Sequence, residues 1–145
     1  MVITFTAILL GLAAIIFPLR QNKFFLLSSA LVIGAAYFIE HNYFRTSIFS
    51  HKTILLFLVF HLIAINVSTF IAYGVDKRAA QQGQWRVSER DLHMLEFLGG
   101  WIGAFIGQRF FHHKTSKKSY QAAYKFMIVM EFAAIWAILK YLRLL

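Results

Sequence analysis

The 145-residue chain is 59% hydrophobic and 14% charged, whereas soluble domains contain about 25% charged residues. This composition excludes an ordinary soluble globular protein and indicates helices that face lipid. The absence of cysteine excludes disulfides and thiolate metal or redox sites. The net charge of +9 comes from basic residues between apolar runs; membrane orientation and anionic headgroups explain that placement, so nucleic acid is not expected as a partner.

The first part of the chain predicts a membrane hairpin. Residues 2–19 are apolar, with no basic start and no small-residue cleavage site, so we expect an uncleaved membrane helix rather than a signal peptide. Arg20 and Lys23 follow directly and place this end in the cytoplasm. Residues 24–39 predict a second helix that returns, and 40–52 predict an external loop. We therefore expect residues 1–52 to form one two-helix unit and 53–145 to form a second membrane domain.

Two further apolar runs each contain one costly polar group. Residues 53–73 are the clearest spanning segment, because they contain no formal charge, and residues 121–139 are the last apolar run. His61 and Glu131 fall near the middle of these two runs. A polar group at such depth is costly unless it is paired, so we expect His61 and Glu131 to form a buried polar pair.

Most of the polar chemistry lies between residues 73 and 120. Gly83 predicts the end of the helix that starts at 53, and Ser88 with Asp91 predicts a capping box for the next helix. Spacings of three and four place small and ionisable residues on one side of that next helix. They are Glu89, His93, Glu96, Gly100, Gly103 and Gly107. The glycines expected to support close helix packing are Gly99, Gly100, Gly103 and Gly107.

Two topologies are open for residues 92–111. If this segment crosses the membrane there are five crossings, with eight basic residues inside and six outside. If it dips in and returns, or lies at the interface, there are four crossings, with ten basic residues inside and four outside. The charge rule favours the second arrangement. Gly99 and Gly100 are then the expected bend, since glycine tolerates the backbone angles that a bend requires.

The second half of the chain also resembles a known family. The likeness rests on short motifs in order: Tyr73-Gly74-Val75-Asp76-Lys77 with Ala79, Trp85-Arg86-Val87-Ser88-Glu89, Leu92-His93, Leu98-Gly99-Gly100 with Gly103-Ala104, and His113-Lys114-Thr115 with Lys117. Together they resemble the bacterial membrane-protein family called domain of unknown function 1294. Ser88 departs from the family, whose members usually have proline there, but serine also starts a helix well. The resemblance implies no established reaction.

The basic and hydroxyl residues of this half suggest a phosphate site. In the four-crossing topology Asp76 and the segment near residue 113 converge on the cytoplasmic side, where cations and a hydroxyl form a cradle for phosphate. The expected ligand-binding residues are Asp76, Lys77, Arg78, Arg109, His113, Lys114 and Thr115. The alternative is that Asp76 pairs with a cation to fix the fold while the other residues hold lipid headgroups without specificity.

His93 and Glu96 are the main candidates for acid and base chemistry, with Asp76 as a third. A carboxylate beside a low-dielectric wall tends to hold its proton more tightly, which suits general acid or base work. The same spacing occurs in metal bundles, but no second matching pair follows, so we expect neither a metal nor a cofactor. A capping and packing role for the pair is the alternative.

The sequence therefore predicts an all-helical integral membrane protein of the bacterial inner membrane. We expect four transmembrane helices plus one re-entrant or interfacial glycine-rich helix, with five transmembrane helices as the alternative. The expected function is binding of an anionic lipid or phosphate-bearing ligand at the cytoplasmic face. The alternatives are a membrane enzyme that acts on a lipid, and an assembly subunit that docks through its glycines. Expected partners are anionic membrane lipids, a second copy of the chain or another membrane protein.

Overall fold

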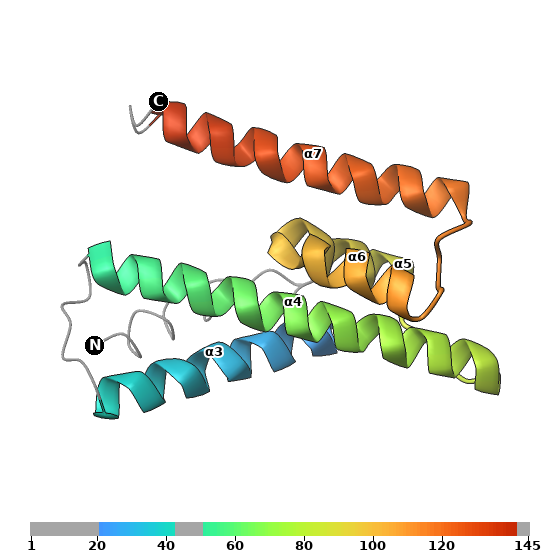
Figure 1. Ribbon diagram of the computed structural model, residues 1–145, viewed down its shortest axis with the longest axis horizontal. Helices are drawn as coiled ribbons and strands as arrows, with labels where there is room; N and C mark the ends of the chain where they lie inside the picture. Colours follow the sequence, from blue (N-terminus) through green and yellow to red (C-terminus); the bar gives the residue numbers. More distant parts are fainter. Residues whose placement is uncertain (1–20, 43–50, 142–145) are drawn as a thin grey trace. The chain divides into compact units, whose positions relative to one another are not determined.

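The computed structural model describes residues 21–42 and 51–141, and every regular element in these ranges is helical (Figure 1). The elements are α3 (Lys23–Asn42), α4 (His51–Gln82), α5 (Glu89–Leu95), a π-helical turn η1 (Glu96–Gly100), α6 (Trp101–Phe110) and α7 (Lys118–Tyr141). The all-helical prediction is thus confirmed for the described chain. The helix expected at 2–19, Arg20 and most of the external loop lie outside the described residues.

The chain divides into two compact units, Met1–Ser68 and Thr69–Leu145. The boundary falls inside α4, so the last turns of this helix belong to the second unit. Within the first unit, α3 and the start of α4 run in opposite directions (Figure 1). The expected division into residues 1–52 and 53–145 is a division into domains, which these compact units do not test, so it stays a prediction. All polar clusters described below lie within the second unit.

Two of the described helices are long and apolar enough to cross a membrane. They are α3 and the part of α4 from Leu55 to Gln82, which comprises 28 residues, and about 20 apolar residues are needed to cross a hydrocarbon core. Both expose large apolar side chains, with Phe38 59% and Leu55 63% accessible. Lipid would cover such surfaces, so length, composition and exposure all point to a membrane protein.

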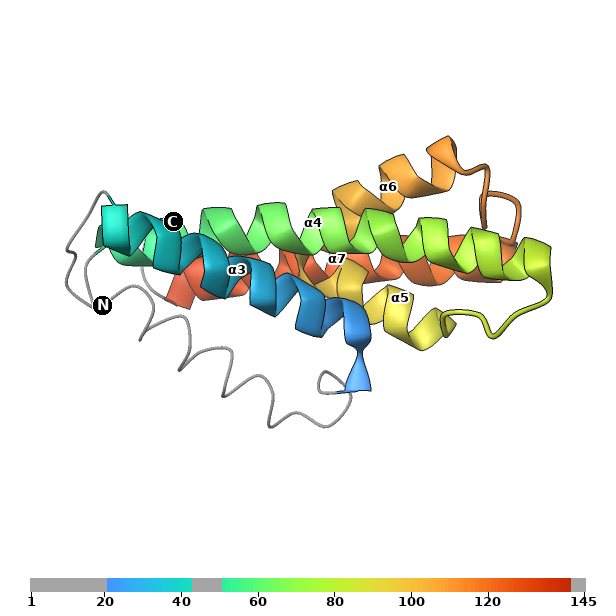
Figure 2. The same cartoon turned by 90° about the horizontal axis from the view of Figure 1, so that it is seen from below.

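The segment from α5 to α6 folds back on itself. A straight helix over residues 89–110 would separate its ends by about 33 Å, yet Lys117 Nζ lies 2.7 Å from Glu89 Oε1. Gly99 has φ 104° and ψ 3° and interrupts the helix within η1. Figure 2 shows α5 running into this bend and α6 running back from it. The predicted bend at Gly99 and Gly100 is confirmed, whereas the single continuous stripe from Glu89 to Gly107 was wrong, because the bend breaks the helix in two.

Glycine is required where α4 and the bend meet. A Cβ on Gly100 would lie 2.2 Å from Thr69 Oγ1 and 2.6 Å from the backbone oxygen of Leu95. A Cβ on Gly107 would lie 3.0 Å from the Cβ of Tyr73, on α4. The glycine side of α6 therefore packs against α4 within the same unit.

The ends of α4 and α5 follow the local signals in the sequence. Gly83 follows α4 directly with φ 64°, the left-handed conformation expected of a residue that stops a helix. The Ser88 side chain accepts a hydrogen bond of 3.1 Å from the Asp91 backbone N–H. The predicted helix stop and N-cap are both confirmed.

Candidate functional site

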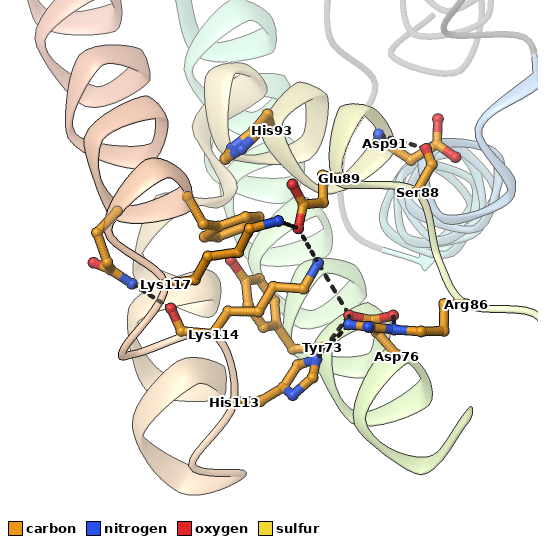
Figure 3. Close-up of polar contacts among 12 residues, drawn as sticks. Tyr73, Asp76, Arg86, Ser88, Glu89, Asp91, His93, His113, Lys114 and Lys117 are labelled. Atoms are coloured by element: carbon orange, nitrogen blue, oxygen red, sulfur yellow. Dashed lines mark hydrogen bonds and ion pairs between the residues drawn. The ribbon is translucent and has the colours of Figure 1, made fainter. Parts of the chain in front are cut away.

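Asp76, near the end of α4, is the centre of the first polar cluster (Figure 3). Its carboxylate is completely buried. Arg86 donates two hydrogen bonds to it, from Nε at 3.2 Å and from Nη2 at 3.3 Å. His113 Nε2 donates a third, at 2.8 Å, and the Lys114 ammonium lies 3.2 Å from Oδ2. One buried carboxylate thus ties α4 to the loop before α5 and to the loop after α6.

The loop after α6 has an unusual backbone. His112 and Lys114 have positive φ angles of 48° and 60°, which are uncommon for residues other than glycine. The backbone N–H of His113 donates to the Gln108 carbonyl at 3.0 Å and holds the loop against the end of α6. The left-handed backbone of His112 and Lys114, on either side of His113, brings the side chains of His113 and Lys114 to Asp76. The contacts with Asp76 therefore stabilise a strained backbone conformation.

Glu89 extends the Asp76 cluster toward solvent. Its Oε1 accepts a 2.7 Å hydrogen bond from Lys117 and lies 3.6 Å from the Lys114 ammonium (Figure 3). The hydrogen bond from Lys117 holds the pKa of the Glu89 carboxyl below its usual range. Likewise, the hydrogen bonds to Asp76 raise the pKa of the Arg86 guanidinium. The Asp76 cluster, namely Asp76, Arg86, Glu89, His113, Lys114 and Lys117, is therefore largely paired internally.

A second cluster surrounds Glu96, which is also completely buried. Tyr73 and Tyr120 donate to its Oε1 at 2.5 and 2.8 Å. His93 Nδ1 donates to Oε2 at 2.6 Å, and the His93 ring stacks on Tyr120 with 4.3 Å between centroids. We call these four residues the Glu96 cluster. Each oxygen of the buried carboxylate has a hydrogen-bond donor, as a stable buried charge requires.

Two glutamines connect the clusters. Gln108 Nε2 donates to the Tyr73 hydroxyl at 3.0 Å. Gln121 Nε2 donates to Gln108 Oε1 at 2.6 Å and to the Lys114 carbonyl at 2.9 Å. In addition, the Lys114 ammonium lies 4.7 Å from the centre of the Tyr120 ring. The two clusters are therefore one network, to which α4, η1, α6 and α7 all contribute.

A pocket of about 350 Å³ lies on the other side of Gln108 and Gln121. Its lining residues are Phe105, Gln108, Arg109, Thr115, Gln121, Tyr124 and Lys125. We call it the Arg109 pocket. The guanidinium of Arg109 lies 4.3 Å from the centre of the Phe105 ring. The lining thus combines two cations, a hydroxyl, two amides and two aromatic rings, without an acidic side chain.

The seven predicted ligand-binding residues separate into three places. Asp76, His113 and Lys114 lie together in the Asp76 cluster, as the four-crossing topology requires. Arg109 and Thr115 line the Arg109 pocket. Lys77 and Arg78 lie on α4 and line neither pocket described for this chain. The residues of the predicted single phosphate site are therefore divided, and His113 and Lys114 pair with Asp76.

Several residues of the network were not among the predicted site residues, although Tyr73 and Arg86 belong to the motifs that carry the family resemblance. They are Tyr73, Arg86, Gln108, Tyr120, Gln121 and Lys125. Tyrosines at the ends of apolar runs look like interfacial anchors, and isolated glutamines have no motif. Only Arg86 had a local signal, because the chain needs a partner for Asp76 and Arg86 follows it closely.

Two other predictions concern a metal site and the pairing of His61 with Glu131. No group of three or more histidine, cysteine, aspartate or glutamate side chains in the described chain could hold a metal ion. His61 belongs to the first unit, where its ring stacks on Phe57, and Glu131 belongs to the second unit. Their pairing stays a prediction.

Comparison with known proteins places this network in a family. Residues 66–120 match the family described as "Protein of unknown function (DUF1294)", and this segment includes both clusters. The chain is 37% identical over 71 residues to "Uncharacterized protein YsdA" of Bacillus subtilis (strain 168), covering 49% of this chain and 80% of that protein. No solved structure matches the chain. The chain therefore belongs to the DUF1294 family.

Proposed function

We propose that this protein binds a phosphate-bearing ligand, in the first place the headgroup of an anionic lipid, in the Arg109 pocket. The observation that supports this most directly is the composition of the lining, in which Arg109 and Lys125 face the same pocket and no carboxylate does. An anion would neutralise these two cations. Lys114, in contrast, already has two carboxylates beside its ammonium group, those of Asp76 and Glu89.

The chemistry of the pocket suits phosphate on one side and a hydrocarbon chain on the other. A guanidinium presents a planar fork that fits phosphate oxygens, and here its stacking on Phe105 restricts its orientation. The Thr115 hydroxyl adds a neutral donor, whereas Gln121, which uses Nε2 on Gln108 and on the Lys114 carbonyl, only shapes the wall of the pocket. Phe105, itself 44% exposed, and Tyr124 supply an apolar wall. A lipid presents this combination of a phosphate and an apolar chain.

The Asp76 cluster has a positioning role in this proposal. It fixes the loop from His112 to Lys117, and that loop holds Thr115 at the pocket. Gln121 donates to the Lys114 carbonyl and lines the pocket at the same time. The ion pairs around Asp76 therefore keep Thr115 and Gln121 in place at the pocket rather than binding the ligand themselves.

We further propose four membrane crossings with residues 89–110 as a re-entrant hairpin, in a multi-pass protein of the bacterial inner membrane. Five crossings would place the segments around residues 77–90 and 109–118 on opposite sides of a core about 30 Å thick. Instead, His113 donates to Asp76 and Lys117 donates to Glu89. Their proximity supports the topology with ten basic residues on the cytoplasmic side, where the Arg109 pocket would face anionic lipids.

Native mass spectrometry of protein released from phosphatidylglycerol-containing membranes tests the binding proposal. Wild type should retain one phosphate-bearing lipid, and Arg109→Gln and Lys125→Gln should each reduce its occupancy at least about tenfold, because each removes a charge-assisted contact. Arg78→Gln and Lys118→Gln remove the same charge outside the pocket and should leave occupancy unchanged. Inorganic phosphate added to the delipidated protein distinguishes a soluble phosphate ligand from a headgroup. Equal loss in all four variants would refute a specific pocket.

The two alternative functions have less support from the geometry. An enzyme would use His93 and Glu96, but these residues do not line the Arg109 pocket, and Glu96 is fully buried. An assembly subunit would dock through its glycines, but Gly107 already packs against Tyr73 of α4. We therefore favour ligand binding.

A further inference from the structure

Lys114 is the one cation of the Asp76 cluster whose hydrogen-bonding capacity is unused. Its side chain is only 4% exposed. The ammonium makes ion pairs with Asp76 and Glu89 at 3.2 and 3.6 Å, and among the described residues its nitrogen has no hydrogen-bond partner in good geometry. A buried donor without an acceptor is unfavourable, so an acceptor that enters here would bind favourably.

Lys114 also lines a second pocket, of about 320 Å³. The other lining residues are Trp85, Arg86, Val87, Ser88 and Glu89, all from the loop before α5 and its first residue. We call it the Lys114 pocket. It shares no lining residue with the Arg109 pocket. The Lys114 pocket therefore lies beside an ammonium group that is itself buried.

Two other groups in this lining can donate to the same ligand. Arg86 donates to Asp76 through Nε and Nη2, and its side chain is 50% exposed and lines the pocket. The Ser88 oxygen accepts from the Asp91 N–H, which leaves its own hydroxyl hydrogen free to donate. Trp85, which is fully exposed, and Val87 provide an apolar rim.

The charges of the cluster set the charge of the ligand. Arg86, Lys114 and Lys117 are cationic, and Asp76 and Glu89 are anionic, so these five side chains have one positive charge in excess. A monoanion balances this excess. A dianion would bring a second negative charge close to the two carboxylates, which disfavours it.

We propose that the Lys114 pocket is a second binding site, which takes a monoanionic oxyanion such as a phosphodiester and holds it through Lys114, Arg86 and Ser88. The site is distinct from the one in the proposed function, because the two pockets share no lining residue, although Lys114 and Thr115 are neighbours on one loop. A phosphodiester can come from a lipid headgroup or from a soluble compound, and both present two non-bridging oxygens that share one negative charge.

Trp85 supplies the measurement, because it is one of three tryptophans and lies on the rim. In full-length protein with Trp101→Phe and Trp136→Phe, dimethyl phosphate is titrated at constant ionic strength while Trp85 emission is recorded. A saturable change is expected. The same titration in nanodiscs with phosphatidylglycerol identifies the source: loss of the response means that the headgroup already occupies the site, and an unchanged response means that the ligand is soluble.

Ser88 offers a matched pair of variants that keep the fold. Aspartate and asparagine both cap helices about as well as serine, but only Ser88→Asp adds a negative charge to the pocket. Ser88→Asp should weaken binding at least about tenfold relative to Ser88→Asn. Arg109→Gln should leave the Trp85 response unchanged. The proposal is overturned if wild type gives no saturable change, if the two Ser88 variants bind equally, or if Arg109→Gln abolishes the response.

Discussion

Replacing Asp76 by asparagine should destabilise the second unit more than any other single charge change at this end of the chain. Asparagine has almost the same shape, so the change removes charge without making a cavity. It leaves Lys114, whose side chain is 4% exposed, beside a neutral amide. It also weakens the two bonds from Arg86 and the one from His113. Breaking a buried ion pair by removing one partner costs about 3–5 kcal/mol.

Glu89→Gln is the matched control, because it removes the same charge from the same cluster at a site where the carboxylate is 43% exposed. Exposed ion pairs contribute about 0–1 kcal/mol, so this variant should stay close to wild type. Unfolding in detergent, followed by circular dichroism against denaturant, measures both free energies. If Asp76→Asn costs less than about 1 kcal/mol, or no more than Glu89→Gln, the buried carboxylate does not hold the loops together as described.

Three further predictions use the same unfolding measurement. Gly100→Ala should lower the free energy of unfolding by at least about 1–3 kcal/mol, since its Cβ would lie 2.6 Å from a backbone oxygen. Gly34 has open space around it, so Gly34→Ala should be neutral or stabilising. Equal effects of the two changes would contradict the close packing at the bend. Tyr73→Phe should cost about 1–3 kcal/mol, because Glu96 loses one donor and Gln108 loses its acceptor; a neutral result would argue against the Glu96 cluster. Folding lowers the pKa of Glu89 from 4.5, so the stability that its carboxylate contributes is complete above that value and is lost as pH falls through the folded pKa. Between about pH 6 and about pH 3, the free energy of unfolding of wild type should therefore fall more than that of Glu89→Gln. Parallel curves of stability against pH would contradict the pairing of Glu89 with Lys117.

Local signals in the sequence predicted the backbone features of the site well. Gly83 stops a helix, Ser88 caps one and Gly99 bends one, and each does so through the conformation of its own few residues. The charge rule also indicated that the loops around Asp76 and His113 lie on one side, because it depends only on where basic residues fall.

The partners within the site could not be predicted in the same way. Phenols and amides have no charge and no spacing rule, so nothing in the sequence linked Tyr73 and Tyr120 to Glu96 or Gln121 to Gln108. Lys125 interrupts an apolar run and has no partner that the sequence indicates, but in the structure it lines the same pocket as Arg109. These contacts depend on how α6 and α7 meet, which helical periodicity does not determine.

The account depends most on the proposed topology, in which the fold-back brings the loops before α5 and after α6 to one side of the membrane. Because the chain contains no cysteine, single cysteines at Gln84 and Ser116, both exposed, can be labelled without background. In oriented inner-membrane vesicles, a membrane-impermeant maleimide should label both positions from the cytoplasmic side and neither from the other side. Labelling of Gln84→Cys and Ser116→Cys from opposite sides would show that residues 89–110 cross the membrane and would contradict the account.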